Sequence, residues 1–242
     1  MGFGNFLWRK LSAWMSARGL LPGTPSAPVG ETRNPDRTVF DRSPLNFLHV
    51  GCGTARKPEV GKGFQGDEWI EIRLDIDPTV EPDVVSSMLD MDQVPAASVD
   101  GVYSAHNIEH LYPHEVPLAL AEFFRVLKPN GLLVLTCPDL ESICRLVADD
   151  KLDEPAYLSS SGPIAPIDVL YGHRESMAAG NLYMAHRTGF TLRTLVAVVR
   201  SAGFRSVAGK RRDDRFDLWV VASKSLLLAQ DISCLAETHF PQ

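Results

Sequence analysis

Two histidines near the middle of the chain have the greatest chemical potential in this sequence. His106 and His110 lie in His106-Asn107-Ile108-Glu109-His110, just after an apolar segment. Imidazole titrates near neutral pH, so either side chain could act as a general base that removes a proton from a hydroxyl or an amine. The alternative for each is a hydrogen bond to a backbone carbonyl.

The same five residues also fit the H-x-x-E-H pattern of one class of zinc hydrolases. That chemistry needs both histidines on a helix, a distant third ligand and a glutamate that activates water. Here the run begins directly after a predicted strand. We therefore treat the match as coincidence and predict no metal site.

A glycine turn and three acids form a second group. Gly51-Cys52-Gly53 follows the apolar run 45–50, and neither glycine has a Cβ that would keep a ligand away from the backbone. Asp75 follows the apolar run 69–74, where a carboxylate can accept hydrogen bonds from ribose hydroxyls. Asp90 and Asp92 come next, in a loop where a carboxylate could accept from an adenine amino group. This order predicts a nucleoside-binding site.

Strands and helices alternate around these groups. Apolar runs predict strands over 45–50, 69–74, 99–103, 132–136 and 216–222, and helical spacing of apolar residues predicts helices over 117–127 and 190–202. Such alternation is typical of βαβ units. We therefore predict an α/β fold: a Rossmann-like, doubly wound, mostly parallel sheet with helices on both faces.

The order of motifs resembles the class I methyltransferases that use S-adenosylmethionine, in particular the type 11-like group. The resemblance runs from Leu45 to about Ala222, and its most specific parts are Ile108-Glu109-His110-Leu111 and Arg125-Val126-Leu127-Lys128-Pro129-Asn130-Gly131. It implies S-adenosylmethionine as the cofactor. It also implies a role for each of these residues: Gly51, Cys52 and Gly53 along the methionine part, Asp75 on the ribose, Ile76 on one face of the adenine, Asp90 and Met91 at its edge, and Ser104 beneath the sulfonium.

The sequence departs from that family in three places. His49 stands where the family usually has an acid that helps to orient the cofactor's ammonium group, and Ala55 stands where it has a third glycine. Residues 56–68 have little helical pattern, so we expect a loop in place of the helix that normally follows the glycine turn. A subgroup that is often thought to modify glycans looks similar in this shortening and in Pro138-Asp139-Leu140.

Residues 157–187 fit neither a strand nor a helix well. Long irregular segments in compact domains are often functional lids, and in related methyltransferases the insert at this point covers the acceptor pocket. The expected acceptor-binding residues, in this insert and just before it, are Asp139, Tyr171, His173, Arg174, His186 and Arg187. Arginines and histidines would suit an anionic or hydroxyl-rich acceptor. The alternative for each insert residue is an ordinary solvated loop position.

The leading hypothesis is therefore methyl transfer from S-adenosylmethionine to an oxygen or nitrogen of a small-molecule or glycan acceptor. The alternative is a non-catalytic protein of the same fold that binds the cofactor or a partner. A nicotinamide dehydrogenase has less support, because its fingerprint needs a glycine where Arg56 stands.

Composition limits the partners and the compartment. The 242 residues carry 24 basic and 30 acidic side chains, a formal net charge of −6, so we expect no nucleic-acid binding. The basic run 210–212 is followed at once by two aspartates and predicts a solvated turn. No run of 18 apolar residues predicts a transmembrane helix. The four cysteines form no CxxC pair, which indicates a reducing, cytoplasmic location.

The predicted organisation has four parts. Residues 1–20 form an amphipathic helix, 21–44 a proline-rich linker, 45–224 the methyltransferase domain with an insert at about 151–189, and 225–242 a tail with a short helix. Apolar residues between 3 and 18 line one face of the first helix, with Arg9 and Lys10 on or beside the other. Two interpretations stay open: packing on the domain or a partner, or peripheral contact with a membrane. We assign no oligomeric state.

Overall fold

The computed structural model describes residues 45–159 and 162–241. The chain divides into two units, residues 1–37 and 38–242, and every described residue belongs to the second. The predicted N-terminal helix and the proline-rich linker lie outside the described residues. Among the helices that the structure describes, none is both long and apolar enough to cross a membrane.

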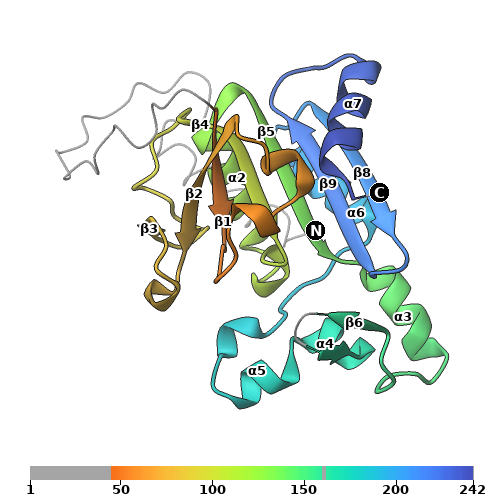
Figure 1. Ribbon diagram of the computed structural model, residues 1–242. Coiled ribbons are helices and arrows are strands. Elements are labelled where there is room, and N and C mark those ends of the chain that lie inside the picture. The colour runs from red at the N-terminus through yellow and green to blue at the C-terminus, as the bar shows by residue number, and fades with distance from the viewer. Residues whose placement is uncertain (1–44, 160–161, 242) are drawn as a thin grey trace, which may run out of the picture. The chain divides into compact units, whose positions relative to one another are not determined.

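A seven-stranded sheet forms the centre of the described part of the chain (Figure 1). Its order is β3-β2-β1-β4-β5-β9-β8, and β9 alone runs antiparallel to the others. The strands are β1 (Leu45–Val50), β2 (Trp69–Asp75), β3 (Val84–Val85), β4 (Val99–Ala105), β5 (Leu127–Pro138), β8 (Ser206–Arg212) and β9 (Asp217–Ser223). The predicted α/β class and mostly parallel sheet are therefore confirmed.

Helices cover both faces of this sheet, as predicted. On one face, α2 (Val116–Val126) and α6 (Leu192–Ser201) pack their apolar sides against the strands, with Leu120, Phe123 and Leu195 fully buried. On the other face, α7 (Ala229–His239) and the short turns η2 (Lys57–Glu59) and η3 (Lys62–Phe64) surround Phe64, which stacks on Phe47. These two clusters of apolar side chains fix the sheet and therefore the ends of its strands.

The segment between β1 and β2 contains no α-helix. As expected for residues 56–68, only η2 and η3 form there. One proline and several glycines interrupt the segment, and the proline, Pro58, lies in the first turn of η2. The glycine turn after β1 is therefore held by contacts other than a following helix.

The insert is more regular than the sequence indicated. After α3 (Leu140–Ala148) come a two-stranded hairpin of β6 (Tyr157–Ser159) and β7 (Gly162–Ile164), then α4 (Pro166–Tyr171), α5 (Arg174–Ala178) and η6 (Leu182–Met184). The prediction of an irregular segment was wrong because each element is only three to six residues long. In Figure 1 this insert lies below the sheet, near the carboxyl end of β1.

The basic run at 210–212 was also misinterpreted. It is the end of strand β8, where Arg211 pairs with Asp139 and Glu141, and Arg212 pairs with Asp217.

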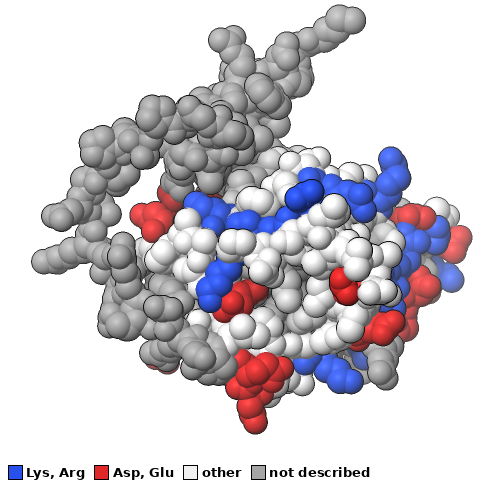
Figure 2. Space-filling model, turned by 90° about the horizontal axis from the view of Figure 1, so that it is seen from above, with Lys and Arg blue, Asp and Glu red and all other residues white. Residues whose placement is uncertain are grey.

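The view from above, on the side away from the insert, shows a row of Lys and Arg with acidic side chains on both sides of it (Figure 2). The described surface visible there therefore carries no uniform charge of one sign.

Candidate functional site

The glycine turn after β1 is shaped by a single asparagine. Gly51 has a φ of 64°, and a Cβ placed on it would lie 2.2 Å from Oδ1 of Asn107. Asn107 in turn donates from Nδ2 to the carbonyl oxygens of Val50 (3.0 Å) and Ala105 (2.8 Å). One side chain therefore joins the carboxyl ends of the neighbouring strands β1 and β4, and the turn has room for it only because residue 51 is a glycine.

Asp75 closes the same turn from the neighbouring strand. Its Oδ2 accepts from the Gly53 amide at 2.7 Å, and its Oδ1 accepts from the Asp77 amide at 2.9 Å. Gly53 has a φ of 51°, and a Cβ placed on it would meet no atom within 4 Å, so this side of the turn is open. The carboxylate is thus fixed beside an open backbone.

Arg73 supports the turn from beneath. The buried guanidinium donates to four carbonyl oxygens, those of Gly53, Ala55, Val80 and Glu81. These oxygens belong to the two loops that follow β1 and β2. Arg73 therefore connects the loops at the carboxyl ends of both strands. It stabilises the glycine turn in a chain that has no α-helix between β1 and β2.

A cavity of about 430 Å³ opens at these strand ends. Gly51, Gly53, Asp75 and Ile76 line it, and the Ile76 side chain is 49% exposed. The remaining predicted cofactor residues, Cys52, Asp90, Met91 and Ser104, are not among its lining residues. Met91 and Ser104 are completely buried, and Met88 and Leu89 lie at the cavity where we expected Asp90 and Met91.

Cys52 is buried behind the turn. Burial raises the pKa of its thiol to about 11, so the group stays protonated at neutral pH. The protonated thiol is therefore no reactive group of the candidate site.

His49, which stands where the resembling methyltransferases usually have an acid, pairs with a mostly buried carboxylate. Nδ1 of His49 lies 2.7 Å from Oε1 of Glu71, and the other oxygen of that carboxylate accepts from the Lys57 amide. His49 is 3% exposed and does not line the cavity. The His49–Glu71 pair therefore connects β1, β2 and the loop 56–68. Neither side chain lines the 430 Å³ cavity.

A second cavity, of about 550 Å³, lies between the sheet and the insert. Of the predicted acceptor residues, His173 and His186 line it. Tyr171 lines a smaller neighbouring cavity. Arg187 lines both that smaller cavity and the 430 Å³ cavity at the strand ends, which we call the cofactor-side cavity.

The other two predicted acceptor residues are occupied elsewhere. Asp139 is fully buried and caps α3, while Arg174 pairs with Asp168 at 2.7 Å and faces a separate hollow. Neither side chain lines the 550 Å³ cavity.

Several residues of this cavity were missed from the sequence. They come from two hairpins that are far apart in the sequence: Tyr157 from β6–β7, and Arg212, Arg215 and Asp217 from β8–β9. Arg212 pairs with Asp217, whereas Arg215 is half exposed. The Arg-Arg-Asp-Asp-Arg run at 211–215 is the signal that could have revealed Arg212 and Arg215.

His106 and His110 lie where the two cavities meet. Together with Met184 they line both, and His106 adopts a φ of 53°, an uncommon backbone conformation for a residue other than glycine. About half of the His106 side chain is exposed. Burial lowers the pKa of His106, but the carboxylate of Glu109, 3.6 Å away, more than offsets this and raises it overall.

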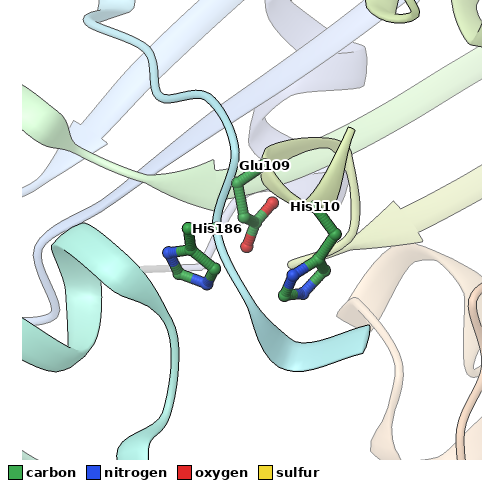
Figure 3. Close-up of side chains that lie close together, drawn as sticks. All are labelled: Glu109, His110 and His186. Carbon is green, nitrogen blue, oxygen red and sulfur yellow. The ribbon is translucent and has the colours of Figure 1, made fainter. Parts of the chain in front are cut away.

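Glu109 lies at the centre of a group of histidines (Figure 3). Its side chain is 2% exposed, and burial alone would raise its pKa; the surrounding His106, His110 and His186 lower it instead. The structure shows no hydrogen bond to either oxygen of this carboxylate. His110 and His186 lie on either side of it, with ring centroids 4.9 Å apart.

Comparison with known proteins agrees with this geometry. Residues 48–135 match the family model described as a methyltransferase domain. Among solved structures, a SAM-dependent methyltransferase from Methanosarcina mazei superposes with a TM-score of 0.50 at 15% identity, over 78% of this chain and 97% of that one. One from Archaeoglobus fulgidus gives 0.47 at 17% identity, over 77% and 89%. A search of curated proteins found no match.

The Methanosarcina superposition shows the fold, and the family match covers the glycine turn, Asp75 and the histidine-containing turn after β4.

Proposed function

We propose that this chain methylates an oxygen or nitrogen of a small-molecule or glycan acceptor held in the 550 Å³ cavity. The methyl group comes from S-adenosylmethionine, because residues 48–135 match a methyltransferase domain. One observation carries the proposal: the two cavities share His106, His110 and Met184. A donor in one cavity and an acceptor in the other would meet at these side chains.

The residues that line the cofactor-side cavity suit the chemistry of S-adenosylmethionine. The Asp75 carboxylate is fixed by two amides, yet each of its oxygens keeps a lone pair for a ribose hydroxyl. Ile76, Met88 and Leu89 offer apolar surface for the adenine ring. The open side of Gly53 allows the methionine part to approach the backbone.

The acceptor-side cavity is polar. Histidines, the exposed Arg215 and the buried Glu109 all line it. An apolar acceptor would leave the Glu109 carboxylate, which accepts no hydrogen bond within the described residues, without a partner, at a free-energy cost. We therefore expect an acceptor rich in hydroxyl, amine or anionic groups.

The transfer itself needs little from the protein except position. When bound, S-adenosylmethionine supplies an electrophilic methyl carbon on a sulfonium. A fixed acceptor atom in line with that carbon provides much of the acceleration. His106 lines both cavities and would accept the proton that a hydroxyl or amine acceptor releases. His110 lies against two carbonyl oxygens and would orient the acceptor or the turn that carries His106.

The domain organisation follows from this assignment. Residues 45–224 would form the catalytic domain, with the insert at about 151–189 as the cover of the acceptor cavity and the tail with α7 packed on β8 and β9. The four cysteines, all described, are unpaired, which supports a reducing, cytoplasmic location.

Calorimetric titration with S-adenosylhomocysteine tests the cofactor site. We expect saturable binding that Asp75→Ala weakens at least tenfold, about 1.4 kcal/mol. A matched control is Asp67→Ala, a loop acid that does not line the cofactor-side cavity. Transfer of a labelled methyl group to a panel of sugars, phenols and amines then tests the acceptor class. Binding without transfer to any of them would favour the non-catalytic alternative.

A further inference from the structure

The group around Glu109 contains the ligands of a metal site. Glu109, His110 and His186 each offer one ligand atom, and these three atoms all lie within 4.8 Å of one another. Figure 3 shows the carboxylate pointing into the space between the two imidazole rings. Glu109 and His110 come from the turn η5 (Ile108–His110) after β4, and His186 comes from the segment after η6, so the sheet and the insert contribute jointly.

The carboxylate needs a cation. Glu109 is 1% exposed, and neither of its oxygens accepts a hydrogen bond within the described residues. An ionised carboxylate in such a place is costly unless it is paired or coordinates a metal. The closest ion-pair contact, Nδ1 of His106, is 3.6 Å away, too far for a hydrogen bond. A divalent ion between the three ligands would satisfy this charge directly.

His186 is prepared as a ligand. Its Nδ1 donates to the Val169 carbonyl at 2.7 Å, which fixes the tautomer and leaves the lone pair of Nε2 free. Metal-binding histidines commonly use a backbone carbonyl in this way to orient the ring. The ring lines both the 550 Å³ cavity and its smaller neighbour.

His110 can also release a ring nitrogen. Its Nδ1 and Nε2 each lie 3.2 Å from a carbonyl oxygen, of Ala185 and His106 respectively. A neutral imidazole can donate to only one of them, so the other nitrogen directs its lone pair at an oxygen. Rotation toward the carboxylate removes this unfavourable contact. Bonds of about 2.1 Å to a tetrahedral ion place the ligands roughly 3.4 Å apart, so a small side-chain movement completes the site.

The donor set selects the kind of ion. Two imidazole nitrogens and one carboxylate suit Zn²⁺, Fe²⁺ and related first-row ions, whereas Mg²⁺ and Ca²⁺ prefer oxygen ligands. Three protein ligands leave a position open for water or substrate. The site also differs from the H-x-x-E-H interpretation, because His106 is outside the cluster and Glu109 is a ligand, not a base.

We propose that Glu109, His110 and His186 bind one divalent transition-metal ion at the wall of the acceptor cavity. All three residues line that cavity, so a bound ion would be able to bind the acceptor's hydroxyl or amine there and ease loss of its proton. This second role rests on the proposed methyl transfer; the binding of the ion does not.

Metal binding is tested on the full chain, prepared without a histidine tag and treated with a chelator. Co²⁺ is titrated while its visible absorption is recorded, and Zn²⁺ is titrated by calorimetry. We expect one equivalent of either ion per chain, with the Co²⁺ bands displaced by Zn²⁺. His186→Asn and Glu109→Gln should each weaken binding at least tenfold.

The matched control is His173→Asn, which alters a histidine of the same cavity outside the cluster and keeps a residue able to cap α5. It should bind the metal like the unaltered protein. No saturable binding, or affinities unchanged in both cluster variants, overturns the site.

S-adenosylhomocysteine binding, measured on the same samples, separates this proposal from the proposed function. A protein that binds metal but not this ligand retains the metal site and loses the methyl-transfer assignment. The opposite result does the reverse.

Discussion

The amide of Asn107 occupies the space that a side chain on Gly51 would need. A Cβ at residue 51 would lie 2.2 Å from Oδ1 of Asn107, in a turn whose φ of 64° already disfavours other residues. Because Asn107 donates to the carbonyl oxygens of the last residues of β1 and β4, the two strand ends form one unit. Gly51 and Asn107 both line the cofactor-side cavity, and His106, next to Asn107 in the chain, lines both cavities.

Gly51→Ala should therefore be more destabilising than Gly53→Ala. Both residues have a positive φ, which costs an alanine about 1–2 kcal/mol, but only Gly51 has a neighbour within 4 Å of its missing Cβ. Displacing Asn107 adds the loss of its hydrogen bonds, about 1 kcal/mol each. Urea unfolding of the two variants without ligand measures the difference. Equal losses of stability would mean that Asn107 moves aside freely.

Arg73→Lys should loosen the loops at the cofactor-side cavity. A lysine has one nitrogen where the guanidinium reaches four carbonyl oxygens, so at least some of these buried oxygens lose their partner. We expect a loss of roughly 2–4 kcal/mol in the free energy of unfolding and weaker binding of S-adenosylhomocysteine. Arg193→Lys, at an exposed position of α6, is the control and should change neither quantity.

His106→Ala should separate catalysis from cofactor binding. If His106 accepts the acceptor's proton, turnover should fall by about a hundredfold or more, while S-adenosylhomocysteine affinity changes less than about threefold. The exposed His114, outside both cavities, provides the control His114→Asn. Unaltered turnover in His106→Ala would remove the residue from the mechanism.

His239 should make the fold less stable in mild acid. Burial lowers the pKa of this histidine to about 4, and the ring packs on Phe64 with Nδ1 unbonded. Below its ordinary pKa of 6.5, the unfolded chain binds a proton that the folded chain takes up only near pH 4. The free energy of unfolding should thus fall between pH 6.5 and 4, by roughly 3 kcal/mol from this group, and the loss should level off below pH 4.

His239→Leu removes that contribution. The difference in the free energy of unfolding between the two proteins, measured by urea unfolding from pH 7 to pH 4, should change by the same amount. Parallel curves would show that the unfolded and folded chains bind this proton equally.

Local patterns were enough to predict five of the seven strands, whereas β3 and β8 were missed. Leu45–Val50 was predicted and found with the same bounds, since four of its six residues are apolar and a glycine turn ends it. Strand β5 is longer than predicted, Leu127–Pro138, because its first residues include Lys128, Pro129 and Asn130, which have low strand propensity. The short elements of the insert lack a full period of either pattern and could not be identified.

The site was predictable only in part, for a related reason. Gly51, Gly53 and Asp75 follow directly from strand ends, so their place at the cofactor-side cavity could be expected. His186 reaches Glu109 from 77 positions along the chain, and no periodicity specifies that approach. Asn107 was overlooked because the type of residue alone does not show which glycine it packs against.

The junction of the two cavities also has a pharmacological consequence. Since His106, His110 and Met184 line both, one compound could extend from an adenosine group at Asp75 to a polar fragment beside His186. Tethering the two halves makes the second contact intramolecular, and the gain depends on how well the linker spans the junction. In a series of such bisubstrate inhibitors, the linker length that gives the highest affinity would therefore measure the distance between the donor and acceptor positions.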